Sequence, residues 1–173
     1  MRILIATALA LALPTGLLAA GGGDEKAPSK PKCEDGLVYD KKTKKCVAAQ
    51  DSRLDTDTLY QTVRALAHAE RFEDARTVLA AMPQGDDRTL TYLGFTSRKM
   101  GQPDAAMGYY TRALAVNPGN ILARSYMGQG LVEEGDITAA IAQLRAIRAH
   151  GGAGSWAEAS LRTAIATGRT FNY

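Results

Sequence analysis

The stretch from Leu90 to Pro118 constrains the fold most, because it contains two amphipathic segments separated by a helix-breaking turn. In the first segment, Leu90, Leu93 and Gly94 recur at three- and four-residue spacings, so they share one face of a helix. The turn spans 101–104, where glycine permits a left-handed cap and proline suits the first turn of the next helix. Pro118 ends the second segment, because proline disfavours a helical residue before it. The stretch therefore predicts a helix–turn–helix unit.

This unit recurs along the chain with a constant period. Residues that return 34 positions later are Gly94 (as Gly128), Gly101 (as Gly135), Ala106 (as Ala140) and Tyr110 (as Leu144). Together with Leu93-Gly94, Gly101, Ala106, Tyr110, Ala113 and Pro118, this period makes the stretch resemble a tetratricopeptide repeat, a family with a repeat of about 34 residues. We therefore expect several such units in tandem.

The resemblance implies an all-α fold, a right-handed α-solenoid of about three helix pairs with a C-terminal capping helix. The expected repeats span 55–82, 88–118 and 120–150, the cap helix spans 155–167, and the whole repeat domain spans 54–167 with a tail at 168–173. The first repeat is expected to be degenerate, because Glu70 stands where the later copies have glycine. Ser155 is expected to cap the last helix, with Glu158 at capping-box spacing.

The first 20 residues predict export. Arg2 is followed by an apolar run that ends in small residues at Ala19 and Ala20, as in a secretory signal peptide. A transmembrane anchor is the alternative, but Pro14 and Gly16 within a short run favour a cleaved signal. We expect an exported protein, periplasmic or alternatively secreted, in which 21–32 is a flexible linker without a stable membrane anchor.

The chain has two cysteines, Cys33 and Cys46, within the segment 33–47. Export places them in an oxidising compartment, where such a pair normally forms a disulfide. We therefore expect a small disulfide-closed hairpin before the helices, stabilised by about 3 kcal/mol through loop closure. Its role is open between a structural staple and a contact site for glycan or protein at Tyr39; the segment also resembles a fragment of chitin-binding domains.

The partner-binding surface is placed by the resemblance, in which the first helices of successive repeats line a concave face. Spacing independently puts Arg88, Thr91, Phe95 and Arg98 on one stripe. Arginine and aromatic residues are common at binding hot spots, so an extended peptide with acidic or carboxylate groups is a plausible ligand. The predicted partner-binding residues, all expected to face outward, are Tyr60, Arg64, His68, Arg88, Thr91, Phe95, Arg98, Lys99, Ser125 and Gln129.

The sequence favours a non-enzymatic protein without metal or cofactor. His68 and His150 lie far apart and beside no cluster with metal-ligand spacing, and Gly128-Gln129-Gly130 is better explained by helix packing than by phosphate binding. A net charge of +3 is too small to indicate nucleic-acid binding. Two functions remain: an exported scaffold that binds a protein or peptide partner on its concave face, and a glycan or cell-wall binder that uses the hairpin.

Overall fold

The structure is a computed structural model that describes residues 28–171. The predicted signal peptide, most of the predicted linker and the last two residues lie outside this range. Within it, the chain forms a hairpin and then seven helices: β1 (Val38–Asp40), β2 (Lys45–Val47), α1 (Thr56–His68), α2 (Phe72–Leu79), α3 (Asp87–Lys99), α4 (Pro103–Val116), α5 (Ile121–Glu133), α6 (Ile137–Ala149) and α7 (Trp156–Thr167). The predicted all-α solenoid is confirmed.

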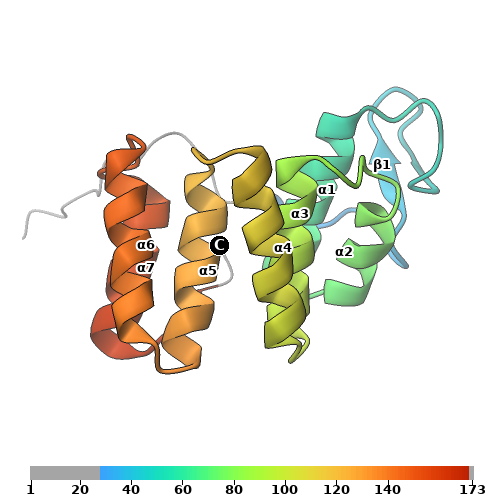
Figure 1. Cartoon of the computed structure of the whole chain (residues 1–173). Helices are drawn as coiled ribbons and strands as arrows, with labels where there is room; N and C mark the ends of the chain where they lie inside the picture. Colours follow the sequence, from blue (N-terminus) through green and yellow to red (C-terminus); the bar gives the residue numbers. More distant parts are fainter. Residues whose placement is uncertain (1–27, 172–173) are drawn as a thin grey trace, which may run out of the picture.

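Successive helices pack as pairs, α1 with α2, α3 with α4 and α5 with α6. The hairpin and α1–α2 lie at one end of the array, and α6 and α7 lie at the other (Figure 1). Helix α7 packs on both α5 and α6, so it takes the place of the first helix of a fourth pair. This helix covers the apolar face that the last pair would otherwise leave open, as the ends of a solenoid require.

Two glycines allow side chains to pack directly on a helix backbone. A Cβ atom added at Gly94 would lie 2.5 Å from Cε1 of Tyr110, whose ring is completely buried. A Cβ atom at Gly128 would lie 2.6 Å from Cδ2 of Leu161 in α7. The repeat period places Leu144 in the position of Tyr110, yet the nearest atoms to Gly128 belong to Leu161, because α7 packs closely on α5.

The turn inside each helix pair uses the left-handed backbone conformation. Gly101 and Gly135 have φ angles of 75° and 83°, and Glu70 has a φ of 60° in the same place of the first pair. A residue with a side chain is strained in this region, whereas glycine is not. The degenerate first repeat therefore keeps the turn geometry of the others with a less suitable residue.

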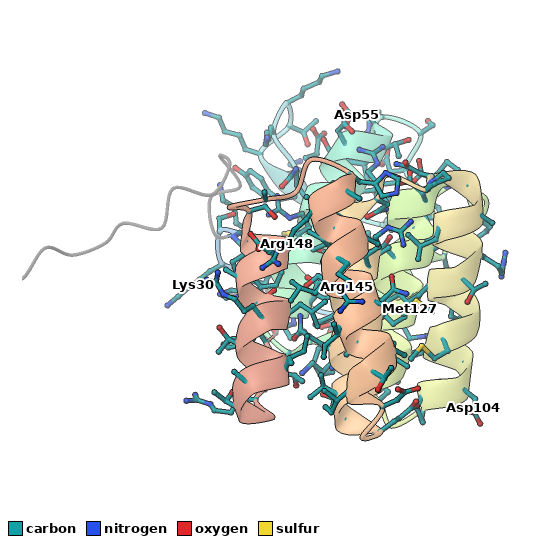
Figure 2. All side chains as sticks on the ribbon, turned by 60° about the vertical axis from the view of Figure 1, so that its left-hand side comes forward. Lys30, Asp55, Asp104, Met127, Arg145 and Arg148 are labelled. Atoms are coloured by element: carbon teal, nitrogen blue, oxygen red, sulfur yellow. A yellow bond between two sulfur atoms is a disulfide. The ribbon has the colours of Figure 1, made fainter. Side chains whose placement is uncertain are left out.

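Side-chain caps fix where five of the helices begin, because each accepts a hydrogen bond from a free backbone N–H of the first turn. The capping residues are Asp55, Asp86, Asn120, Asp136 and Ser155. Ser155 Oγ accepts from Glu158 N, as expected. The Glu158 carboxylate accepts from Gly154 N at 2.7 Å instead of from Ser155 N, and it also pairs with Arg148, which is labelled in Figure 2.

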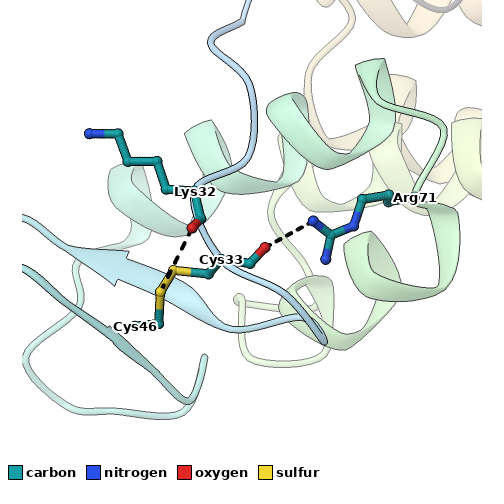
Figure 3. The surroundings of a disulfide bond; sticks show 4 residues. All are labelled: Lys32, Cys33, Cys46 and Arg71. Atoms are coloured by element: carbon teal, nitrogen blue, oxygen red, sulfur yellow. Dashed lines mark hydrogen bonds between the residues drawn. A yellow bond between two sulfur atoms is a disulfide. The ribbon is translucent and has the colours of Figure 1, made fainter.

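The predicted disulfide between Cys33 and Cys46 is confirmed. It closes an antiparallel hairpin in which Val38 pairs with Val47, and Val38 is completely buried in the core formed with α1 and α2. Arg71 Nη1, just before α2, donates to the carbonyl oxygen of Cys33 at 2.9 Å (Figure 3). The hairpin therefore packs into the first helix pair and covers its outer end.

Candidate peptide-binding groove

Two neighbouring helices present matching stripes of residues at three- and four-residue spacing, which places each stripe on one side of its helix. We call this side the groove face and define it by Arg88, Thr91, Phe95 and Arg98 of α3 and Leu122, Ser125, Gln129 and Glu133 of α5. A hydrogen bond joins the two stripes at one end, where Arg98 Nη1 donates to Glu133 Oε1 at 2.6 Å. The groove face therefore has an upper half, near the start of these helices, and a lower half, near their ends.

The expectation that all ten predicted residues face outward is wrong for six of them. The structure buries Arg64, Thr91, Phe95, Arg98, Ser125 and Gln129, leaves Tyr60, Arg88 and Lys99 half-buried, and exposes His68. For the five residues on α3 and α5, the reason is the position of these helices in the middle of the array, where helices on both sides cover them. Arg64 belongs to α1, and its guanidinium carbon lies 5.9 Å from the centroid of the Tyr60 ring. The assignment of these residues to partner binding stays a prediction.

A row of aromatic rings crosses the array, with one ring from each of the helices α1, α3, α5 and α7. The ring centroids are 5.7 Å apart for Tyr60 and Tyr92, 6.1 Å for Tyr92 and Tyr126, and 6.1 Å for Tyr126 and Trp156. All three pairs meet edge to face, an arrangement that stabilises aromatic contacts. Burial raises the pKa of Tyr92 and Tyr126. Sequence analysis missed this row, although the 34-residue spacing of Tyr92 and Tyr126 was a signal for it.

The upper half of the groove face opens into a cavity of about 480 Å³, which we call the upper pocket. Four helices contribute to its lining: Tyr60 from α1, Arg88 and Thr91 from α3, Leu122 from α5 and Trp156 from α7. Arg88 lies over the ring of Tyr60, with 4.9 Å between the guanidinium carbon and the ring centroid. The pocket therefore combines half-buried aromatic surface with a cation.

The cation of the upper pocket is held by acidic residues beside it. Arg88 Nη1 donates to Asp57 Oδ1 at 2.8 Å, and this hydrogen bond raises the pKa of Arg88 against the opposing effect of burial. On the other side of the pocket, Asn120 Nδ2 donates to Asp87 Oδ2 at 2.8 Å and to Thr91 Oγ1 at 3.1 Å. These bonds fix the polar groups of the pocket before any partner arrives.

The lower half of the groove face is built around Arg98, whose side chain is only 3 % exposed. Burial works to lower the pKa of Arg98, but the nearby Tyr110 and Glu133 outweigh it and the pKa is raised. Gly130 makes room for this side chain, because a Cβ atom there would lie 3.2 Å from Arg98 Cδ. Burial also raises the pKa of Tyr110 to about 12. Sequence analysis missed Glu133, since its partner lies 35 residues away.

Lys99, the remaining cation of this end of α3, is half-buried beside the same pair. Burial is the main cause that lowers its pKa, and the positive charge of Arg98 adds to it. Its amino nitrogen lies 5.9 Å from the centroid of the Phe95 ring. The stripe predicted to face outward is therefore a packed layer in which each cation contacts a ring or a carboxylate.

Residues 97–165 match the family model of the tetratricopeptide repeat. This part of the chain belongs to the tetratricopeptide repeat family. The match begins at the end of α3 and runs through α7, so the tetratricopeptide repeats include the lower half of the groove face. Comparisons with curated proteins and with solved structures find no match to this chain.

Tetratricopeptide repeats are typically non-enzymatic scaffolds for protein–protein interaction. Among residues 28–171, no group of three or more histidine, cysteine, aspartate or glutamate side chains could hold a metal ion. In the same range, no helix has the length and apolar character needed to cross a bilayer. The tetratricopeptide repeats and the groove face are therefore the features from which a function can be argued.

Proposed function

We propose that this protein is an exported scaffold that holds an extended peptide segment of a partner protein along the groove face. The observation that carries the proposal is the upper pocket, a cavity to which all four first helices contribute a side chain. A site built from side chains of successive helices fits a ligand that crosses the repeats, as an extended chain does. Tetratricopeptide repeats indicate a protein-interaction scaffold, which agrees with this arrangement.

The chemistry of the upper pocket favours a peptide with an apolar side chain near a carboxylate. Tyr60 and Trp156 offer half-buried ring surface, and rigid aromatic side chains bind with little loss of conformational entropy. Arg88 supplies the cation for a carboxylate, but Asp57 already binds it, so an incoming acid has to compete for that guanidinium. The expected ligand therefore owes more of its affinity to apolar contact than to charge.

Export is the second part of the proposal. Its support is the apolar run at residues 1–20, which lies outside the described residues, together with the disulfide between Cys33 and Cys46. Disulfides persist in oxidising compartments such as the periplasm or the cell exterior. A fusion of residues 1–32 to a reporter that is active only after export tests this part, and a reporter kept in the cytoplasm contradicts it.

Peptide binding in the upper pocket is tested with a matched pair of substitutions. Arg88 lies over Tyr60 in the pocket, and Arg112 lies over Tyr109 on α4 with 5.7 Å between guanidinium carbon and ring centroid. A peptide is first selected from a displayed library on the wild-type chain, and its affinity is then measured by calorimetry. We expect Tyr60→Ala to weaken binding at least about tenfold, the effect of losing about 1.4 kcal/mol, and Tyr109→Ala to leave it unchanged. Equal effects of the two substitutions would contradict the proposal.

Glycan binding by the hairpin is the second candidate. A cavity of about 410 Å³ lies between the hairpin and α1, and Tyr39 contributes to its lining. Lys32 lies over this ring, with 4.4 Å between Nζ and the ring centroid, so a sugar has to displace the lysine before it can stack there. The groove face is therefore the favoured site. Substitution Tyr39→Ala, assayed by cell-wall pull-down, tests the hairpin without removing the buried Val38.

A further inference from the structure

The last described residues of the chain turn back onto the groove face. Helix α7 ends at Thr167, and Gly168 caps it in the left-handed conformation with a φ of 72°. Thr170 Oγ1 then donates to Glu133 Oε1 at 2.6 Å, and Phe171 N donates to Gln129 Oε1 at 2.7 Å. Both acceptors belong to the lower half of the groove face. The C-terminal tail therefore lies across the side of α5 on which the upper pocket also opens.

Gln129 is oriented to accept a hydrogen bond from a peptide backbone. Its side chain is completely buried, and its Nε2 atom donates to Ser125 Oγ at 3.3 Å. Ser125 Oγ is in turn 3.0 Å from Ser160 Oγ of α7, so the amide nitrogen already has a partner within a buried polar chain. The amide oxygen is left to accept the N–H of Phe171. Every residue except proline carries such an N–H, so Gln129 recognises an extended backbone rather than one side chain.

Glu133 makes the second contact with the tail from the next turn of α5. Its Oε1 atom accepts from Arg98 Nη1 and from Thr170 Oγ1, both at 2.6 Å. The buried arginine holds this carboxylate in place, which leaves it ready for a hydroxyl group. The lower half of the groove face therefore contains two fixed acceptors, one for a backbone N–H and one for a serine or threonine hydroxyl.

We infer that Thr170 and Phe171 act as an intramolecular ligand of the lower half of the groove face and restrict a partner peptide to the upper half. This inference rests on the proposed function, because it concerns access to the same face. Each contact of the tail is weak by itself, a factor of about five in the docking equilibrium for one hydrogen bond. Because the tail directly continues α7, its docking costs little of the translational and rotational freedom that a free peptide loses, so weak contacts suffice to keep it docked.

A docked tail lowers the apparent affinity of any peptide that needs the lower half. The apparent dissociation constant equals the intrinsic one divided by the fraction of time for which the tail is undocked. A tail docked about nine-tenths of the time therefore weakens the binding of such a peptide about tenfold. The tail also defines the class of peptide that this half accepts, an extended segment with a hydroxyl-bearing residue followed by a residue other than proline. Partners of this class compete directly with the tail.

The experiment uses full-length chains that differ only in the tail. The probe is a synthetic peptide with the sequence of residues 168–173 and a dye at its N-terminus, and binding is followed by fluorescence anisotropy. Phe171→Pro removes the N–H that Gln129 accepts, Thr170→Val removes the hydroxyl that Glu133 accepts, and Arg169→Ala changes an exposed neighbour as the control. We expect each tail variant to bind the probe about fourfold more tightly than wild type, because losing one such hydrogen bond lowers the docked fraction from about nine-tenths to about six-tenths. The control should match wild type.

Two results would overturn the inference. If neither tail variant binds the probe more tightly than wild type, the tail does not occupy the site. If light scattering shows wild-type dimers that Phe171→Pro abolishes, the tail binds a second copy instead of its own chain. Both results leave the proposed function intact, because that depends on the loss of peptide binding in Tyr60→Ala, whose side chain lies in the upper pocket.

Discussion

Replacing Gly94 by alanine tests the closest contact between the two helices of the central repeat. Gly94 lies inside α3, where its Cα faces the ring of Tyr110 from α4. An added Cβ would lie 2.5 Å, 2.6 Å and 3.0 Å from three atoms of this ring. The ring is fully buried, so its neighbours restrict its movement, although it also lines a cavity of about 250 Å³. The substitution therefore forces the two helices apart.

Two opposing effects set the size of the change in stability. Alanine is favoured over glycine inside a helix by about 1 kcal/mol. Overpacking a filled core costs about 1–3 kcal/mol, and a contact this short with a rigid ring belongs near the upper end. We therefore expect Gly94→Ala to lower the free energy of unfolding by about 1–2 kcal/mol. For a chain of this size, that lowers the melting temperature by roughly 2–8 °C.

Gly108→Ala is the matched control, because Gly108 lies inside α4 with no atom within 4 Å of an added Cβ. This control gains helix propensity without a clash, so we expect it to raise stability by up to about 1 kcal/mol. Urea unfolding followed by circular dichroism measures both variants. If Gly94→Ala is as stable as Gly108→Ala, the contact with Tyr110 does not limit the approach of α3 and α4.

Three further predictions concern stability. Cys33→Ser with Cys46→Ser should lower the free energy of unfolding by about 3 kcal/mol, measured in urea, because the closed loop no longer restricts the unfolded chain. Glu70→Gly should raise the melting temperature, because glycine adopts the left-handed conformation of this position without strain. The greater conformational entropy of glycine in the unfolded chain offsets part of this gain. The free energy of unfolding should fall as the pH rises from 10 to 12, by up to about 1.4 kcal/mol per pH unit for Tyr110 alone. In the unfolded state the Tyr110 hydroxyl ionises near pH 10, whereas in the folded state it stays neutral up to a pKa of about 12. Unfolding of Tyr110→Phe over the same range should show a shallower dependence on pH.

The sequence predicted those parts of the fold that depend on local patterns. The spacing of Gly94 and Gly128 located the second and third helix pairs, and Ser155 was identified as a cap from residue type and the capping-box spacing of Glu158. A turn glycine, a helix cap and a helical stripe each depend on residues only a few positions away along the chain. Such features can therefore be read without knowing which helices meet.

The groove face was only partly predictable, because burial depends on contacts between distant segments. Phe95 and Arg98 have the spacing of an outward stripe, but α5 covers them, and Arg98 pairs with a carboxylate 35 residues away. The contact between Phe171 and Gln129 joins residues 42 positions apart and involves a backbone N–H. A backbone donor leaves no trace in the residue types, so no pattern in the sequence pointed to it.

The hairpin and α7 cover opposite ends of the helix array, and this fixes the number of helices that a bound peptide can cross. Four first helices at the usual spacing of 8–10 Å span about 24–30 Å between the outer axes. An extended chain advances by about 3.3–3.6 Å per residue, so this span corresponds to about eight residues. With the hairpin packed on the first pair and α7 packed on the last, the number of helices in the array sets the length of peptide that it can bind.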